Sequence, residues 1–515
     1  MSGAGAQASV NVSGAGTHAT REVTWHPRVG LFLLLILLGL LLTMIGTYAL
    51  GRFGAAAALA LVLAGPPSAV ALALGLRQAI PKFRRLCKSL TWWHGLWLVL
   101  LVSGFMIRTK SRAVAQIEQN PVDAAAAFRV VLVGITALVL MVRLALRRPP
   151  WLGSFCRGLV GVMALFGLVC AVSATWSVKP SWTLYKSWEY LIDVALLAAI
   201  LASVRSLGTY ETLLDWTWVL CGLLVASAWL EAPFWPEEAW EGQYVGGLLN
   251  IRLGGVFPGQ GSNAVGTLGA IVAAIAVCRL LPAVQRKFDR AWYILLLLFG
   301  VATMVFTQTR SAIGGFVLGV LLVFFFTKRA RLAVALGFVS AAALALTGAG
   351  SALLAFLQRG QSGAEIVTLS GRVGWWAAAW EVFKQHPWTG LGAYAAGSFA
   401  VWPSLGLKEV GPIHSDYVEM LVGTSVWGPL LILIGLLGTW WVLIRCLRRP
   451  SSPPLERQLA LECIAVLAIL TVRSTVMNVI VSHPPLQHLV VLGYAEYLRR
   501  RYNRGTATAP FTGGR

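Results

Sequence analysis

Charged residues are scarce in this chain of 515 residues, and acidic residues are scarcer than basic ones. Only 12% of the residues are charged, against about 25% in soluble globular proteins, and 57% are hydrophobic. This apolar content excludes a disordered chain. The 42 Lys and Arg outnumber the 20 Asp and Glu, but they are scattered between apolar runs and form no stripe of the kind that binds nucleic acid. The composition predicts a polytopic membrane protein with no nucleic-acid partner.

Familiar metal, nucleotide and nucleophile motifs are also missing. The seven cysteines form no CxxC pair and have no metal-like spacing to histidine, so a disulfide framework is not predicted. The chain has no Walker-type loop, no DxD-like or His–Glu metal cluster and no GxSxG nucleophile elbow. We therefore expect neither a cofactor nor a metal.

Long apolar runs dominate what is present. A helix that crosses the hydrocarbon core needs about 20 mainly apolar residues. Fourteen runs qualify or nearly qualify: Val29–Leu50, Ala55–Leu76, Thr91–Met106, Val130–Leu146, Gly158–Ala174, Trp188–Val204, Thr212–Leu230, Asn263–Leu281, Ala291–Phe306, Ser311–Thr327, Leu332–Gly350, Val426–Ile444, Leu459–Val472 and Leu486–Leu498. Arg473 interrupts one apolar run near the C-terminus. The runs predict an all-α polytopic membrane protein with about 12–14 transmembrane helices.

The basic residues predict the orientation. Cytoplasmic loops are enriched in Lys and Arg. With the N-terminus inside and each run crossing once, about two thirds of the 42 basic residues fall on inside segments, and both termini are cytoplasmic. The predicted organisation is a disordered tail at 1–28, transmembrane helices 1–11 within 29–350, an outer loop at 351–425, helices 12–14 within 426–498 and a basic tail at 499–515.

Two predicted outer loops, 231–262 and 351–425, are longer than most connections between helices. Connections this long are usually functional when ordered, so we expect the chemistry there. Within the larger loop, the stretch Trp375–Phe383 has aromatic residues at helical spacing. It predicts a helix at the outer membrane surface, where Trp is favoured.

His414 is the candidate general base in the larger loop. Its unperturbed pKa near 6.5 allows it to take a proton near neutral pH. Asp416 and Glu419 are close enough in sequence to orient its ring or to stabilise its cation. A surface or helix-capping histidine is the alternative.

Three arginines in the outer loops and loop ends are candidates for binding a diphosphate: Arg252, Arg310 and Arg372. A guanidinium can hold such a group through two parallel hydrogen bonds. Anchoring to lipid headgroups is the alternative for each of them.

A few charges lie inside the apolar runs, where ionisable side chains are functional candidates by default. Glu189, Asp193 and Arg473 are the examples. Lys186, Glu189 and Asp193 recur at helical spacing, so an ion-pair ladder along one helix is the alternative.

The order of these motifs resembles that of the O-antigen ligase and O-antigen polymerase superfamily of bacterial membrane glycosyltransferases. The likeness covers roughly residues 155–445 and departs from the usual pattern at Ser415, where the family usually has Asn. It is carried by Trp176–Pro180, Arg252–Gly255, Thr307–Arg310, Ser370–Arg372 with Trp375 and Trp376, Pro387–Gly392, His414–Tyr417 and Val426–Gly428.

The resemblance implies a type-C glycosyltransferase architecture in the bacterial inner membrane, with a periplasmic catalytic loop. Such enzymes pass a glycan from undecaprenyl diphosphate to an acceptor hydroxyl, on lipid A-core or on a growing glycan, without a metal. His414 is then the base, and Arg310 and Arg372 bind the diphosphate. We favour an O-antigen ligase over a polymerase. A polysaccharide-lipid transporter is the alternative from another class.

Overall fold

The computed structural model describes residues 77, 79–89, 91–104, 124–147, 151–204, 206–242, 251–281, 290–347, 349–407 and 411–507. All of them belong to one compact unit, Leu74–Arg515. The predicted tail at 1–28 and the first two predicted membrane runs, Val29–Leu50 and Ala55–Leu76, lie outside the described residues. The last residues of the basic tail, 508–515, lie outside them too.

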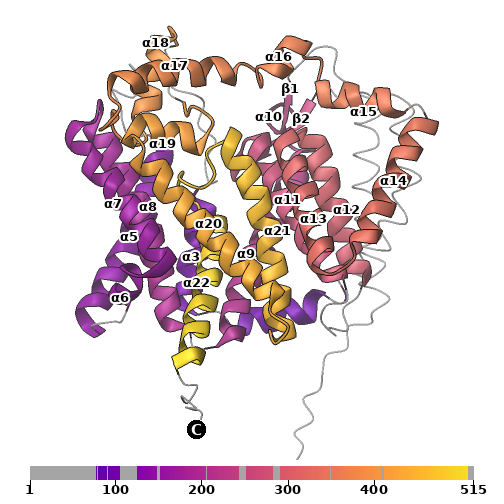
Figure 1. Cartoon of the computed structure of the whole chain (residues 1–515), viewed down its shortest axis with the longest axis horizontal. Helices are drawn as coiled ribbons and strands as arrows, with labels where there is room; N and C mark the ends of the chain where they lie inside the picture. The colour runs from indigo at the N-terminus through magenta and orange to yellow at the C-terminus, as the bar shows by residue number, and fades with distance from the viewer. Residues whose placement is uncertain are drawn as a thin grey trace, which may run out of the picture. The chain divides into compact units, whose positions relative to one another are not determined.

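The described chain is built mainly of helices (Figure 1). In chain order the elements are α3 (Trp92–Ser103), α5 (Ala124–Arg147), α6 (Trp151–Phe155), α7 (Gly158–Val172), η1 (Ser173–Trp176), α8 (Pro180–Ser203), α9 (Leu207–Glu231), α10 (Pro236–Ala239), β1 (Trp240–Gly242), β2 (Ile251–Leu253), β3 (Gly255–Val256), β4 (Gly259–Gln260), α11 (Ser262–Leu280), α12 (Arg290–Thr307), α13 (Arg310–Phe326), α14 (Ala330–Leu346), α15 (Ala349–Gln358), α16 (Gly363–Val367), α17 (Arg372–Gln385), η2 (Gly397–Val401), α18 (Trp402–Ser404), α19 (Asp416–Thr424), α20 (Trp427–Arg448), α21 (Pro454–Val476) and α22 (Leu486–Ala507).

Each of the predicted apolar runs from Thr91 onward overlaps one of the long helices. Among the described residues, six helices are long and apolar enough to cross a membrane: Gly158–Trp176, α9, α11, α12, α20 and α21. The helices α3 and α13 are apolar but shorter. The predicted all-α polytopic membrane fold is confirmed, and the count of 12–14 helices for the whole chain stays a prediction.

Charged residues near the ends of two predicted runs have polar partners inside the protein, and the helices continue through them. Helix α21 continues through Arg473, whose guanidinium donates to the Ser311 hydroxyl and to the Asn263 carbonyl. Helix α8 begins at Pro180, well before the predicted run at Trp188, and Lys186 in its added turns forms an ion pair with Glu189.

The two long connections contain secondary structure of their own. Segment 231–262 holds α10 and two short antiparallel hairpins, β1–β2 and β3–β4. Segment 351–425 holds most of α15, then α16 to α19, and the predicted helix over Trp375–Phe383 lies within α17. Figure 1 shows α15, α16 and α17 across one end of the helical bundle, which we call the site end; the C-terminal end of α22 lies at the other end.

Small residues bring α13 and α21 into close contact. A Cβ atom on Gly315 would lie 2.8 Å from the Cα of Ile469, and one on Gly319 would lie 2.9 Å from the Ala465 carbonyl oxygen. Such glycine pairs let helix backbones approach in membrane proteins, where packing contributes much of the association. This contact places Arg473, near the end of α21, beside Ser311 at the start of α13.

Replacing Gly315 with Ala is expected to destabilise the bundle by about 1–3 kcal/mol, because the added methyl group overlaps the α21 backbone. The matched control is Gly314→Ala, whose Cβ would meet no atom within 4 Å. Thermal unfolding in detergent, followed by tryptophan fluorescence, measures both. Equal melting temperatures for the two variants would contradict the packing described here.

Candidate functional site

His414 lies just before α19 at the site end, in a backbone turn that few residues adopt. Its φ is 57°, in the left-handed region, and such strained residues cluster at functional sites. The next residue, Ser415, caps α19 by accepting a hydrogen bond from the Val418 N–H at 3.4 Å. The chain therefore turns sharply at His414 and then enters the helix at once.

Helix α17 packs against the ring of His414. The centroid of the Trp375 ring lies 5.3 Å from that of His414, and the two planes are tilted by 31°. The neighbouring Trp376 donates from its indole N–H to the carbonyl of Ile413 at 3.2 Å. Within the described part of the chain, the His414 Nδ1 atom is buried and has no hydrogen-bond partner. The ring is thus fixed by packing and keeps one nitrogen available.

The surroundings keep the His414 imidazole neutral. Burial lowers its pKa to about 4, with further lowering by the positive charges of Arg372 and Arg473. At neutral pH the ring carries one proton and can accept another, as a general base must. A bound anion that screens the two guanidiniums would raise this pKa and strengthen the base.

Arg372, a predicted site residue, is the first residue of α17. Three consecutive residues before it, Leu369, Ser370 and Gly371, all have positive φ and form a tight reversal. This reversal directs the guanidinium toward the connection between α21 and α22, where its Nη2 lies 3.8 Å from the Met477 sulfur. The positive charge of Arg372 helps to lower the pKa of His414, so the structure brings these two predicted residues together.

Arg473 was predicted as a functional candidate inside an apolar run, but not as a neighbour of His414. It is 1% exposed, and its terminal nitrogens donate to the Ser311 hydroxyl at 2.8 Å and the Asn263 carbonyl at 3.1 Å. Among the described residues, its Nε atom has no hydrogen-bond partner. The sequence signal was the arginine inside an apolar run, but its position relative to His414 depends on how α21 packs.

Arg252, on β2, joins the same group through a shared neighbour. It is 6% exposed and donates to the Thr307 carbonyl at 3.2 Å and to the side-chain oxygen of Asn263 at 3.4 Å. Asn263 therefore contacts both Arg252 and Arg473. The charges of Arg252 and Arg372 both act on Arg473, so these three arginines lie within electrostatic reach of one another.

Arg310, the third predicted arginine, begins α13 and contacts the chain that leads into α17. Its guanidinium donates to the Leu357 carbonyl at 3.0 Å, the Gln361 side chain at 2.7 Å and the Ser370 hydroxyl at 3.3 Å. Ser370 stands two residues before Arg372. The contacts of Arg310 thus hold the reversal that orients Arg372.

Asp416 and Glu419 bind backbone rather than the His414 ring. The Asp416 carboxylate accepts N–H groups of Val479, Ile480 and Val481 at 2.9–3.4 Å. The Glu419 carboxylate accepts the N–H of Ile413 at 2.9 Å. We predicted that they orient the His414 ring directly, but their described hydrogen bonds go to backbone N–H groups instead. Because α19 turns both side chains inward, they hold the two backbone segments that flank the site.

Burial raises the pKa of both carboxyls, to about 7 for Asp416 and about 7 for Glu419. Folding therefore favours their protonated forms, and the stability that each contributes is present at low pH and lost as the pH rises through about 7. Since one pKa unit corresponds to about 1.4 kcal/mol, each carboxyl is expected to cost roughly that much stability between pH 6 and pH 8.

Asp416→Asn is expected to remove about half of this pH dependence, measured as the difference in unfolding free energy between pH 6 and pH 8 in detergent. Glu381→Gln is the control, because Glu381 is an exposed carboxylate on α17 that pairs with Lys384. The same pH dependence in the Asp416→Asn variant and the unmodified protein would contradict the raised pKa.

In the described residues no group of three or more His, Cys, Asp or Glu side chains is placed to hold a metal ion. What the site offers instead is one neutral imidazole beside several guanidiniums. Chemically, this arrangement can accept a proton and stabilise an anion at adjacent positions.

Comparison with known protein families identifies the segment that contains most of this site. Residues 292–433 match the family described as O-antigen ligase. The match includes Arg310, Arg372 and His414, whereas Arg252 and Arg473 lie outside it. No curated protein sequence matches the chain. The predicted resemblance to the O-antigen ligase and polymerase superfamily is confirmed over residues 292–433.

Proposed function

We propose that the protein transfers a glycan from undecaprenyl diphosphate to an acceptor hydroxyl, as an O-antigen ligase does. The observation that carries the proposal is the neutral His414 imidazole held beside Arg372 and Arg473, within and next to the O-antigen ligase segment. A base and an anion-binding group at adjacent positions are what this transfer requires.

In the proposed step, His414 removes the proton from the acceptor hydroxyl, and the oxygen attacks the anomeric carbon of the donor glycan. The bond between that carbon and the diphosphate oxygen breaks, and undecaprenyl diphosphate leaves with the electron pair. Arg372, Arg473 and Arg252 stabilise the negative charge that grows on the leaving group. Preorganised donors of this kind lower a barrier most where water is largely excluded. No metal takes part in this step.

The distribution of basic residues supports a periplasmic site in the bacterial inner membrane. Helix α20 begins at the site end and ends with Arg445 and Arg448, and α22 ends beyond Arg499 to Arg501 at the opposite end. Cytoplasmic ends are rich in such residues. The proposed orientation therefore places the C-terminus in the cytoplasm and His414 at the periplasmic face.

The transfer is tested in proteoliposomes with a lipid-linked glycan and candidate acceptors, lipid A-core among them. A product made in one step on a second molecule indicates a ligase. A ladder still attached to undecaprenyl diphosphate, with the growing glycan as acceptor, indicates the polymerase alternative. Translocation of the labelled donor without formation of a new bond would contradict both and indicate the transporter.

His414→Ala is expected to reduce transfer at least about 100-fold, because general-base catalysis typically contributes that much or more. Arg372→Ala and Arg473→Gln are expected to reduce it by a similar factor through the loss of a charge-stabilising donor. His386→Ala is the matched control, since His386 is exposed at the end of α17. Full product formation by the inserted His414→Ala protein would overturn the base assignment.

The pH dependence of kcat/KM reports the pKa of the base in the free enzyme. Because the pKa of His414 is lowered to about 4, kcat/KM is expected to stay level from pH 8 to about pH 5 and to fall only below that. Arg372→Gln removes a nearby positive charge, so the acid limb should move to higher pH. An unshifted limb near pH 6.5 in both proteins would contradict this. Asp416→Asn controls for titration of Asp416.

A further inference from the structure

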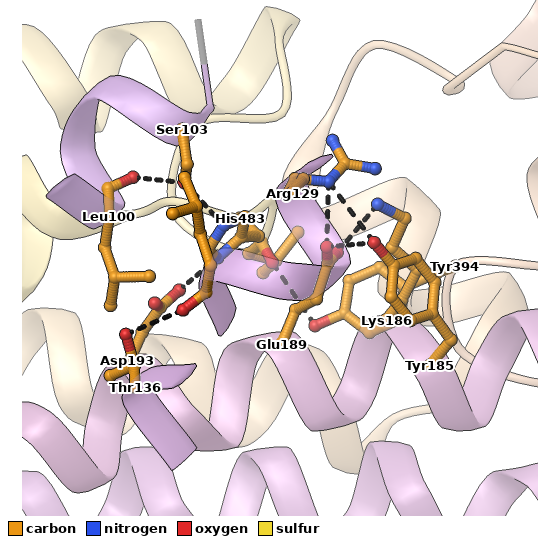
Figure 2. Close-up of polar contacts among 12 residues, drawn as sticks. Leu100, Ser103, Arg129, Thr136, Tyr185, Lys186, Glu189, Asp193, Tyr394 and His483 are labelled. Carbon is orange, nitrogen blue, oxygen red and sulfur yellow. Dashed lines mark hydrogen bonds and ion pairs between the residues drawn. The ribbon is translucent and has the colours of Figure 1, made fainter. Parts of the chain in front are cut away.

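A second group of cations lies at the site end, on helices α5 and α8, outside the residues assigned to transfer. The carboxylate of Glu189 is fully buried, and Arg129 and Lys186 both bind it at 2.8 Å. The Tyr185 hydroxyl also donates to it. Figure 2 shows these three side chains around the Glu189 carboxylate. The predicted ion-pair ladder is thus confirmed for Lys186 and Glu189.

Asp193, the third member of the predicted ladder, pairs elsewhere. Its carboxylate lies 2.7 Å from the Nδ1 atom of His483, in the connection between α21 and α22 (Figure 2). Glu189 is therefore paired with two cations, Arg129 and Lys186. The three side chains together carry a net charge of +1.

Arg129 uses only one of its nitrogens on this carboxylate. Its Nε atom contacts both Glu189 and the Tyr185 hydroxyl. The two terminal nitrogens point away from Glu189 in Figure 2 and make no hydrogen bond to a described residue. These terminal nitrogens form the edge of the guanidinium that binds two oxygens of a phosphate in parallel. The Lys186 ammonium adds a third donor beside it.

The two cations are partly exposed, and tryptophans lie next to them. The side chains of Arg129 and Lys186 are 27% and 18% exposed, and Trp188 on the same helix is 48% exposed. The Lys186 ammonium lies 5.7 Å from the Trp182 ring centroid. Trp and Tyr are enriched at both membrane–water interfaces, the level of the lipid headgroups.

Hydrogen bonds connect this group to the transfer site. The start of α8 is held against the chain that precedes η2, by Val178 N–H to Leu391 O at 3.0 Å and by the Thr183 hydroxyl to Ala393 O at 2.8 Å. Leu391 in turn donates its N–H to Val422 in α19, the helix that begins two residues after His414. A lipid held by Arg129 therefore lies beside the same end of the bundle.

We propose that Arg129 and Lys186 bind the phosphate monoester of a membrane lipid, and that this lipid is the acceptor of the transfer. The first part stands on the geometry alone, and the second rests on the proposed function. The donor diphosphate and the acceptor phosphate would then occupy separate cationic groups, and the acceptor lipid would bring its hydroxyl to His414.

The binding experiment uses the full-length protein in nanodiscs of phosphatidylcholine with or without phosphatidic acid, and measures retained phosphatidic acid by native mass spectrometry. The unmodified protein is expected to retain it in preference to phosphatidylcholine. Arg129→Gln/Glu189→Gln is the sharpest variant, because it removes a cation and its buried partner together and leaves the net charge of the group at +1. The preference should fall about ten-fold, as expected for the loss of charge-assisted hydrogen bonds.

Two further proteins make this result decisive. Arg129→Lys keeps the charge and the contact with Glu189 but loses the two-nitrogen edge, so it should also lose most of the preference. Arg143→Gln, near the opposite end of α5, should keep it. Unchanged retention of phosphatidic acid by a correctly folded Arg129→Gln/Glu189→Gln protein would overturn the phosphate site.

The acceptor assignment is tested separately, in the transfer assay. Phosphatidic acid is expected to compete with the lipid acceptor, which raises the KM for the acceptor and leaves kcat unchanged. Binding of phosphatidic acid without competition would overturn the acceptor role and leave a structural lipid site. If no transfer occurs at all, the proposed function fails, while the binding experiment still decides the phosphate site.

Discussion

The mutual repulsion of three guanidinium groups at the site end is the constraint on which the chemistry of this protein depends. Arg473 and Arg252 are buried, and neutral oxygens of Asn263, Ser311 and Thr307 accept their hydrogen bonds. No carboxylate of the described residues forms an ion pair with Arg473. These neutral acceptors position the two guanidiniums, which can then donate to an arriving anion. Burial, together with the positive charges of Arg372 and Arg473, lowers the pKa of His414 and keeps its ring neutral and able to accept a proton.

The connection between α21 and α22 joins the polar groups of the site end into one structure. Residue by residue, Met477 contacts Arg372, the N–H groups of 479–481 bind Asp416, and His483 pairs with Asp193. Three parts of the chain that are far apart in sequence therefore meet on one short segment. A shift of this segment would move the first residue of α17 and the start of α19 together, which preserves the position of Arg372 relative to His414.

The apolar runs predicted the helices well, because membrane burial imposes length and composition on the sequence itself. His414 and Arg372 could also be identified, since few titratable groups occur in the long connections. Arg473 could not be assigned, because it lies 59 residues after His414 and reaches the site only through the close packing of Gly315 against α21. The role of Asp416 was likewise hidden: its closeness to His414 in sequence suggested a contact, but the helix turned its side chain toward residues 479–481.

We propose that Arg372, Arg473 and Arg252 surround the position of a diphosphate next to His414. The most direct test of this proposal is a cryo-electron microscopy structure of the protein with a polyprenyl diphosphate in a nanodisc. We predict phosphate density within hydrogen-bond reach of Arg372 and Arg473, with the His414 ring on the glycan side of it. Diphosphate bound elsewhere on the protein, with these arginines keeping only their present partners, would contradict the claim.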